Sequence, residues 1–305
     1  MFESLFSRGG LSLDRLRSFL EVAEAGSISK AASRDLSRQA LISRQIRELE
    51  EYFGTELTHR SGKTIVISPA GRRLAILIRE QFQDLNDFCV EQHKQAKDFS
   101  LGAGASILEW MVIPAAAKIR RALGNSSLRL SSSRSHDLVQ HIREGRLDFA
   151  IVREDAIPKP LPRIPLTQVK FHICVSRRLI GGQPKARLDD LAYLQTLPFA
   201  ATGGRGQLDQ TFRQAMAATT GSFSPAFECD SLLQVRELVI QGACAALLPS
   251  LGIQGLAEQE ILIREFTSMK TYGRALALHW NERQMRRRGI ELAEIQKMSR
   301  ALIKP

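Results

Sequence analysis

The segment from Ala31 to Ile46 combines a helical apolar stripe with a dense set of arginine and amide side chains. Its apolar residues, continued by Leu49 and Phe53, recur at spacings of one, four, three and four, which predicts a helix with one buried face. The other face then carries arginines, glutamines and serines. Guanidinium groups hold phosphates, and guanidinium and amide groups pair with base edges in a major groove. The segment therefore predicts a DNA-binding helix; the alternative is a solvated basic face whose arginines pair with the acids that follow.

Two shorter helices are predicted before this one. Apolar residues at helical spacing predict the first over 13–23, followed by a glycine that ends it, and a serine N-cap predicts the second over 27–34. A turn near Leu36-Ser37 then leads into the third helix, from about 38 to 53, where Gly54 ends it. Three short helices with tight joints predict a helix-turn-helix unit.

A hairpin and one long helix are predicted next. Residues 57–68 form two short extended runs joined at Ser61-Gly62, which predicts a β-wing. After Pro69 the pattern becomes a single helix over 70–97, about 40 Å long at 1.5 Å per residue. Positions on one side of this helix repeat at four and three residues, with polar residues at two of them, which predicts a coiled-coil seam and a homodimer. The alternative is a helix that packs on its own chain. The seam comprises Leu74, Ile78, Gln81, Leu85, Phe88 and Gln92.

From Phe99 onward, extended runs alternate with helical patterns, which predicts parallel sheets covered by helices. The expected strands are 100–103, 127–130, 149–152, 169–175, 197–201, 245–248 and 275–278, and helical patterns include 113–123, 136–145 and 232–242. Roughly 200 residues suit two linked α/β lobes with a cleft between them. The fold class is therefore α/β, with a winged helix-turn-helix domain, a linker helix and a two-lobed domain. The expected boundaries are 1–69, 70–97 and 98–305, with lobe one at about 98–168 and 275–305 and lobe two at about 169–274.

The net charge of +11 is spread along the whole chain. Residues 1–75 hold twelve Lys and Arg against nine Asp and Glu, a net of +3, so the other +8 lies downstream. Total charge therefore indicates attraction to polyanions and little more. No apolar run approaches the about 18 residues of a membrane span. The opening MFESLFSRGG lacks an apolar signal core, so we expect a cytoplasmic protein with no membrane partner.

Catalytic and metal-binding signatures are missing from the sequence. Four scattered cysteines show no metal spacing and are predicted to be buried thiols, with redox sensing by one of them as the alternative. The histidines form no metal-ligand cluster, and no nucleophile elbow, P-loop or zincin motif is present. Gly102–Ser106 imitates the start of a dinucleotide fingerprint but lacks its third glycine. We therefore expect no enzyme activity and no cofactor. Arg286-Arg287-Arg288 is expected to be a solvated face, with nucleic-acid contact as the alternative.

Motifs spread over nearly the whole length resemble the LysR-type transcriptional regulators. The helix-turn-helix pattern of the family is matched by Ala31-Ala32, Gln39, Ser43-Arg44-Gln45-Ile46 and Leu49-Glu50, and its wing by Arg60–Lys63 and Ile67–Gly71. Its effector domain is matched by Ile113-Pro114, Glu144–Ile151 and the stretch from Gly242 to Pro249. The resemblance implies a winged helix-turn-helix, a dimerising linker helix and a two-lobed domain similar to periplasmic binding proteins. It also implies tetramers built from dimers, and control of transcription by a small molecule.

Candidate contacts follow from the third helix and from the resemblance. We hypothesise that Arg38, Gln39 and Ser43, with Ala40 beside them, reach base edges. Phosphates of double-stranded DNA are then held by Arg34, Arg44, Arg60 and Lys63. The resemblance places an effector site near Ser106, Ser133, Thr202, Cys229 and Ala243 of the Gly242–Ala245 loop. The downstream positive charge is compatible with an anionic effector, and for Ser106 a simple N-cap is the alternative.

Four residues depart from the pattern of the family. Asp35 replaces an apolar residue, Arg38 a serine, Thr58 a phenylalanine and Cys244 a glycine. Because the first two flank the start of the third helix, the base preference cannot be carried over. Three other functions stay open from the sequence: a solute-binding protein with an appended helical domain, an enzyme acting on a metabolite, and a DNA-binding protein without effector control.

Overall fold

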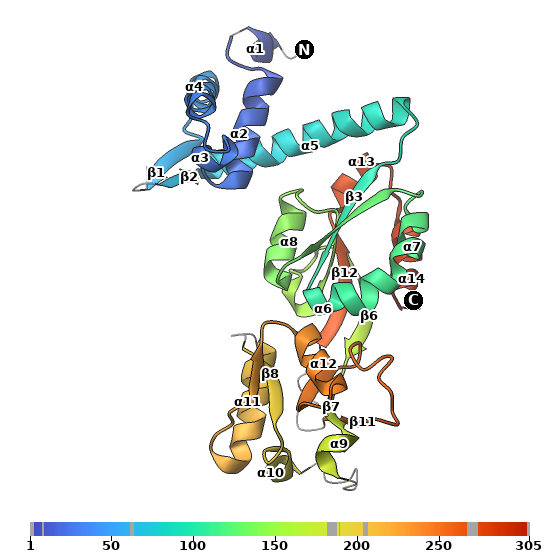
Figure 1. Ribbon diagram of the computed structural model, residues 1–305. Coiled ribbons are helices and arrows are strands. Elements are labelled where there is room, and N and C mark those ends of the chain that lie inside the picture. Colours follow the sequence, from blue (N-terminus) through green and yellow to red (C-terminus); the bar gives the residue numbers. More distant parts are fainter. Residues whose placement is uncertain are drawn as a thin grey trace. The chain divides into compact units, whose positions relative to one another are not determined.

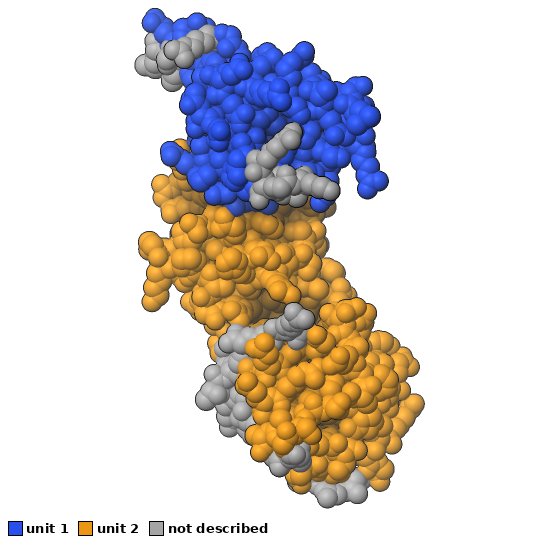
Figure 2. Space-filling model, turned by 90° about the vertical axis from the view of Figure 1, so that its left-hand side faces the viewer, with its two compact units in different colours: residues 1–97, 144–146 blue, residues 98–143, 147–305 orange. Residues whose placement is uncertain are grey.

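The computed structural model describes residues 3–7, 9–61, 64–181, 188, 190–203, 207–266 and 274–303. It divides into two compact units (Figure 2): unit 1 comprises residues 1–97 and 144–146, and unit 2 comprises 98–143 and 147–305. Unit 1 contains α1 (Glu3–Phe6), α2 (Leu13–Ala25), α3 (Ile28–Ala31), α4 (Leu36–Phe53), β1 (Thr58–Ser61), β2 (Thr64–Ile67) and α5 (Pro69–Gln92). No described helix is both long and apolar enough to cross a membrane.

The caps of the three short helices explain where each begins and ends. The expected glycine stop of α2 is confirmed, because Gly26 adopts a left-handed backbone, and Ser27 caps α3 by accepting from Lys30 N. Helix α4 begins two residues earlier than predicted. Asp35, the departure from the family pattern, caps it by accepting from Ser37 N (2.8 Å) and Arg38 N (3.2 Å). The turn before α4 therefore lies earlier as well, at Ser33 and Arg34, which have φ of 50° and 68°.

Apolar side chains of α2, α4, α5 and the loop before the wing form the core of unit 1. Phe19, Val22, Ile42 and Leu49 are fully buried, as the apolar stripe predicts. The predicted wing is confirmed as the antiparallel pair β1–β2.

Glu50 joins this core to the wing through one carboxylate oxygen, Oε1. That oxygen accepts from the backbone N of Leu57 and Thr58, each at 2.9 Å, and from Thr58 Oγ1 at 3.2 Å. A hydroxyl at position 58 is therefore accommodated by a charged acceptor rather than by apolar packing.

Helix α5 starts at a serine cap and ends earlier than predicted. Ser68 accepts from Gly71 N (2.9 Å), and the helix stops at Gln92, not at residue 97, because Lys94 adopts a left-handed backbone with φ of 53°. A Cβ at Gly71 would lie 2.2 Å from the backbone oxygen of Leu57, so this position requires glycine. The first turn of α5 thus packs directly on the backbone of Leu57, the residue just before β1 of the wing.

Unit 2 contains two five-stranded sheets, and we call the part built on each a lobe (Figure 1). Lobe one has the strand order β4 (Ser127–Ser132), β3 (Asp98–Ala103), β5 (Phe149–Arg153), β12 (Arg274–Trp280) and β6 (Arg163–Val169). Lobe two has the order β11 (Ile261–Glu265), β7 (Phe171–Ser176), β10 (Ala245–Pro249), β8 (Phe199–Thr202) and β9 (Phe227–Cys229). The helices are α6 (Ala105–Ile107), η1 (Leu108–Val112), α7 (Ile113–Ala122), α8 (Ser135–Arg143), η2 (Glu154–Ala156), α9 (Arg177–Ile180), α10 (Leu191–Leu194), α11 (Gln207–Thr220), α12 (Leu232–Ile240), α13 (Glu282–Arg287) and α14 (Leu292–Ile303).

The expectation of parallel sheets is wrong in part, because both sheets are mixed. β3 runs parallel to β4 and β5, but β12 runs antiparallel to β5 and β6, and β10 runs antiparallel to β7. Strands joined through a covering helix stay parallel, whereas β6, β7 and β12 carry the chain between the lobes and run against their neighbours. Only Lys170 separates β6 from β7, which is why the sequence reads as a single run there.

The central strand β5 is covered on both faces. Phe149 and Ile151 pack with residues of α7 and α14, while Ala150 and Val152 pack with residues of α8 (Figure 1). Alternate side chains of one strand therefore serve two cores, as a sheet between two helical layers requires.

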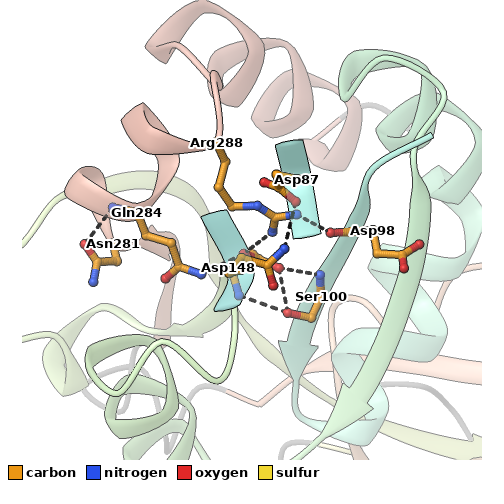
Figure 3. A network of polar contacts seen from close by, with 8 residues as sticks. Asp87, Asp98, Ser100, Asp148, Asn281, Gln284 and Arg288 are labelled. Atoms are coloured by element: carbon orange, nitrogen blue, oxygen red, sulfur yellow. Dashed lines mark hydrogen bonds and ion pairs between the residues drawn. The ribbon is translucent and has the colours of Figure 1, made fainter. Parts of the chain in front are cut away.

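Arg288 is buried in lobe one, so the expectation of a solvated face is wrong for it. The residue is 2% exposed, and its guanidinium donates to Asp148 Oδ1 (2.6 Å) and Asp98 O (2.5 Å), as Figure 3 shows. Its guanidinium carbon also lies 4.1 Å from the centroid of the Phe99 ring. The sequence gives three similar arginines in a row, and only the packing distinguishes the last one.

Asp148 collects donors from three directions. Besides Arg288, it accepts from Ser100 N and Ser100 Oγ, both at 2.8 Å, and from Gln284 Nε2 at 2.9 Å (Figure 3). A buried carboxylate is stable only with such partners. The family motif around Asp148 therefore serves the fold of lobe one by joining β3, β5 and α13.

Candidate DNA-binding surface and effector cleft

The face of α4 opposite the core carries the predicted DNA contacts. Of these, Arg34, Arg38, Ala40 and Arg44 are exposed, and Gln39 and Ser43 are partly exposed. Lys63 and the side chain of Arg60 lie outside the described residues. Helix packing thus brings the expected residues of α4 and its preceding turn to the solvent side of unit 1.

Arg38 is held by a carboxylate that the sequence analysis did not single out. Glu21 of α2 accepts from Arg38 Nη2 through Oε2 (2.9 Å) and from Arg17 Nε through Oε1 (3.0 Å). One acid thus bridges two arginines on adjacent helices. Glu21 lies off the core-facing stripe of α2, and no sequence pattern links it to Arg38 across seventeen residues.

Arg44 stays largely solvated beside Glu48, one of the acids that follow the arginines in the sequence. Its Nε lies 3.7 Å from Glu48, and its side chain is 71% exposed. Glu48 makes a closer ion pair with Arg15 of α2. Arg44 is therefore free to turn toward a phosphate at little cost, since exposed pairs of this kind stabilise by well under about 1 kcal/mol.

A cavity of about 770 Å³ lies within unit 2 and is lined by residues of both lobes. Its volume is in the range of small-molecule sites. Ser106 and Ser133 line it, as the resemblance implies, whereas Thr202, Cys229 and Ala243 are not among its lining residues. The described charged residues of its wall are Arg134, Arg153, Arg274 and Asp137, and its large apolar residues are Ile107, Trp110, Val169, Phe171, Leu208, Leu232, Leu251 and Leu276.

Thr202 faces Asp209 instead of the large cavity. Its hydroxyl donates to the carboxylate of Asp209 at the start of α11. Burial raises the pKa of Asp209, while the bond from Thr202 and the charges of Arg213 and Arg274 act in the opposite direction. Desolvation is the largest effect, so the carboxylate is held in a place that favours its neutral form.

Replacing Asp209 with asparagine is expected to stabilise the protein at pH 7 more than at pH 4. The pKa of Asp209 is higher in the folded state than in the unfolded state. Its contribution to the free energy of unfolding is therefore fully present below the unfolded-state pKa of about 3.9 and is lost as pH rises through the folded-state pKa. At pH 7 the wild type carries the cost of a buried charge that asparagine removes. Asparagine keeps an acceptor for Thr202 without the charge. Urea unfolding at both pH values measures the difference. The exposed variant Asp230→Asn serves as the control, and an equal response of both variants to pH would refute the assignment.

The cysteines are only partly as predicted. Cys174 and Cys244 are buried and Cys229 is half-buried, but Cys89 on α5 is exposed, which corrects the expectation of four buried thiols. Burial raises the pKa of Cys174 and of Cys244 to about 12. Because the thiolate is the reactive form, these two residues are unsuited to redox sensing.

Two models of the same protein family match this chain, one in each unit for most of its length. Residues 13–72 match the model of the bacterial regulatory helix-turn-helix protein, lysR family, and residues 92–293 match the LysR substrate binding domain. The chain belongs to the LysR family. Its DNA-binding and effector-binding domains make it a transcriptional regulator, as the resemblance implied.

Curated relatives of this LysR-family chain are named as regulators too. HTH-type transcriptional regulator TrpI of Pseudomonas aeruginosa is 29% identical over 248 residues, covering 80% of this chain and 82% of its own length. MetR of Haemophilus influenzae is 30% identical over 161 residues, covering 50% of this chain and 52% of its own. A probable nitrogen assimilation transcriptional activator of Synechococcus elongatus is 24% identical over 285 residues and covers 90% of both chains.

Solved LysR-family structures share the fold. A full-length OxyR variant from Pseudomonas aeruginosa gives a TM-score of 0.63 at 17% identity, covering 96% of this chain and 98% of that one. Full-length CbnR in complex with its target DNA gives 0.56 at 17% identity, covering 95% and 100%. At these identities the likeness describes the architecture alone.

Proposed function

We propose that this LysR-family regulator recognises a specific duplex sequence through α4 and is controlled by a small anionic molecule held in the cavity of unit 2. The observation that carries the proposal is the outward face of α4, on which cationic and amide side chains stand above a fully apolar stripe. Such a helix fits a major groove, and the first turns of a recognition helix contact base edges. A regulator of this kind acts in the cytoplasm, where the chromosome of a bacterium lies.

The residues of α4, of the turn before it and of the wing divide into two roles in this proposal. Arg38, Gln39 and Ser43 lie in the first half of α4 and contact base edges, with Ala40 against the groove floor. Arg34 and Arg44 hold phosphates, together with Arg60 and Lys63 of the wing. The relative CbnR, whose structure was solved with its target DNA, supports this use of the fold.

Selection from a random duplex library by the full-length protein tests the proposal. The expected result is a shared sequence that binds far more tightly than scrambled duplexes at the same salt concentration. The proposal is contradicted if no shared sequence is recovered and the affinity for every duplex falls equally as salt rises. The protein would then bind DNA without sequence specificity.

Replacing Arg38 with alanine is expected to cost about 1–3 kcal/mol at the selected sequence and to relax preference at one base pair. Arg44→Ala is the matched variant, because it removes an exposed arginine six residues further along the same helix. It is expected to weaken selected and scrambled duplexes alike and to lower the salt slope by about one unit. Fluorescence anisotropy with both duplexes at several salt concentrations measures these changes. A uniform loss in Arg38→Ala would make Arg38 a phosphate contact.

A homodimer through α5 completes the proposed assembly, with tetramers formed from dimers. Gln81, Leu85 and Phe88 of the predicted seam are exposed, and Leu77 adds a further exposed apolar residue to the helix. Leu74 and Ile78 pack instead against the core of unit 1, which removes them from a seam on the outer face. The proposed interface is therefore the C-terminal half of α5 and not its whole length.

Effector control follows from charge and shape in the cavity. Three arginines and one aspartate among its described lining residues favour an anion, although Arg153 also pairs with Asp155 at 3.1 Å. A ligand that binds better when the lobes are closed shifts the population toward that state. In a dimer, lobe closure changes the angle between the α5 helices and so the spacing of the two α4 helices. Effector and DNA then alter one another's affinity by the same factor.

A further inference from the structure

One aromatic side chain of the cavity touches both lobes. Trp110 belongs to the π-helical turn η1 of lobe one and lines the cavity. Across from it, a Cβ built on Gly252 of lobe two would lie 2.7 Å from both Cη2 and Cζ3 of the Trp110 ring. The φ of Gly252 is not in the left-handed region. Glycine is therefore required here by the close approach of the indole and not by the backbone conformation.

The lobe-two side of this contact is fixed by an arginine. Arg236 of α12 donates from Nε to Gly252 O (2.8 Å) and from Nη2 to Gln254 O (3.1 Å). Leu251, beside Gly252, and Leu232, the first residue of α12, line the same cavity as Trp110. The indole thus packs on a loop that is tied to the helix whose start borders the cavity.

The cavity wall offers an aromatic and apolar surface near a cationic one. Phe171 and Trp110 supply rings, and Arg134, Arg153 and Arg274 supply the positive charge. An indole attracts a second aromatic ring through its quadrupole, beyond what burial of apolar area contributes. A guanidinium pairs with a carboxylate through directed hydrogen bonds. The wall therefore matches a small molecule with a flat ring and an acidic group.

We propose that Trp110 is an effector contact that selects aromatic anions and transmits their binding to lobe two through Gly252. The inference rests on the proposed function of the cavity and adds the chemical class of its ligand. An aromatic ring on the indole is expected to improve affinity about fivefold to tenfold over a saturated ring of the same size. Movement of the indole then presses on the loop held by Arg236.

Isothermal titration of the full-length protein with three probes tests the ligand class. Phenylacetate has a ring and a charge, cyclohexylacetate has the charge with a saturated ring, and 2-phenylethanol has the ring without the charge. Phenylacetate is expected to bind about fivefold to tenfold more tightly than cyclohexylacetate, and 2-phenylethanol at least about tenfold more weakly than phenylacetate. Equal affinities for the two acids, or no binding of phenylacetate at about 10 mM, overturns the proposal.

Two variants of Trp110 separate recognition from folding. Trp110→Leu is expected to lower phenylacetate affinity about fivefold to tenfold and to leave cyclohexylacetate within about twofold, so that the preference disappears. Trp110→Phe keeps a ring and is expected to retain part of the preference. Equal losses for both acids in both variants would mean that Trp110 only supports the cavity, and would overturn the proposal.

Gly252→Ala tests the transmission step. In a Trp280→Phe background Trp110 is the only tryptophan, because the chain has two. The added methyl group must displace the indole, so the emission of Trp110 is expected to shift without ligand, and phenylacetate affinity is expected to fall. Unchanged emission and affinity would overturn the coupling. Binding of the selected duplex without any ligand is measured in parallel: if it persists while phenylacetate fails to bind, the DNA-binding function stands and only the ligand class falls.

Discussion

Replacing Arg288 with methionine is expected to lower the free energy of unfolding of unit 2 by about 3–5 kcal/mol. The substitution removes the guanidinium that donates to Asp148 Oδ1 at 2.6 Å and to Asp98 O at 2.5 Å. It leaves the carboxylate of Asp148 inside lobe one with fewer donors, and an uncompensated buried charge is among the most destabilising changes in a protein. The lost contact with Phe99 adds to the effect.

Arg286→Met is the matched control for this prediction. Arg286 lies two residues earlier, is 76% exposed and pairs only at the surface with Glu282. Its loss is expected to cost less than about 1 kcal/mol. Urea unfolding followed by tryptophan fluorescence, to which the buried Trp280 of lobe one contributes, measures both variants. Similar midpoints for the two would mean that burial of Arg288 contributes little. The double variant Arg288→Met, Asp148→Leu is expected to recover part of the loss, since it removes both charges.

Introducing aspartate at Leu85 and Phe88 is expected to separate the proposed dimer and to lower affinity for the selected duplex by about 10²- to 10⁴-fold. The two side chains are 52% and 60% exposed in the chain by itself, and a carboxylate buried against its own copy would repel it. A monomer binds the duplex through one α4 helix only. In the dimer, binding of the first α4 helix holds the second one near the DNA at a high effective concentration, and the monomer lacks this gain.

Asn86→Asp is the control, because it adds one negative charge, half of that in the double variant, at an exposed position between Leu85 and Phe88 on α5. Sedimentation equilibrium gives the oligomeric state, and anisotropy gives the affinity. The control is expected to remain dimeric. A dimer that survives the changes at Leu85 and Phe88 would exclude the C-terminal half of α5 as the interface. A monomer that binds DNA as tightly as the wild type would exclude avidity.

The helix-turn-helix unit could be predicted closely because its signals are local. Ser27, Gly26 and Gly54 act within one or two turns of the helices they bound, and the apolar stripe of α4 has a period that the backbone enforces. The start of α4 was missed because Asp35 was treated as a departure from the family and not as a cap. The capping bonds to Ser37 N and Arg38 N are themselves a property of the residue type.

Features that depend on distant contacts could not be predicted in this way. Arg288 meets Asp148 across 140 residues, and Glu21 meets Arg38 across seventeen, so no window of sequence contains either pair. The heptad pattern of α5 predicts a seam along the helix, but Leu74 and Ile78 in its first half pack against the core of unit 1. In the cavity, the serines were suggested by resemblance, whereas Trp110, Arg153 and Arg274 are far apart in the sequence and line one cavity only when lobe one is folded.

The bare backbone at Gly71 has a consequence for how a signal reaches the chromosome. Because the first turn of α5 lies directly on the carbonyl of Leu57, the β1–β2 hairpin cannot rotate independently of α5. A rotation of α5 must therefore turn the wing and the helix-turn-helix together as a rigid body. In the proposed dimer, we therefore expect an effector to change the distance between the two α4 helices and the bend of the DNA between the two operator halves. The base preference of each α4 helix is expected to stay the same. The length of DNA between the two operator halves, rather than their sequence, then decides which promoters respond.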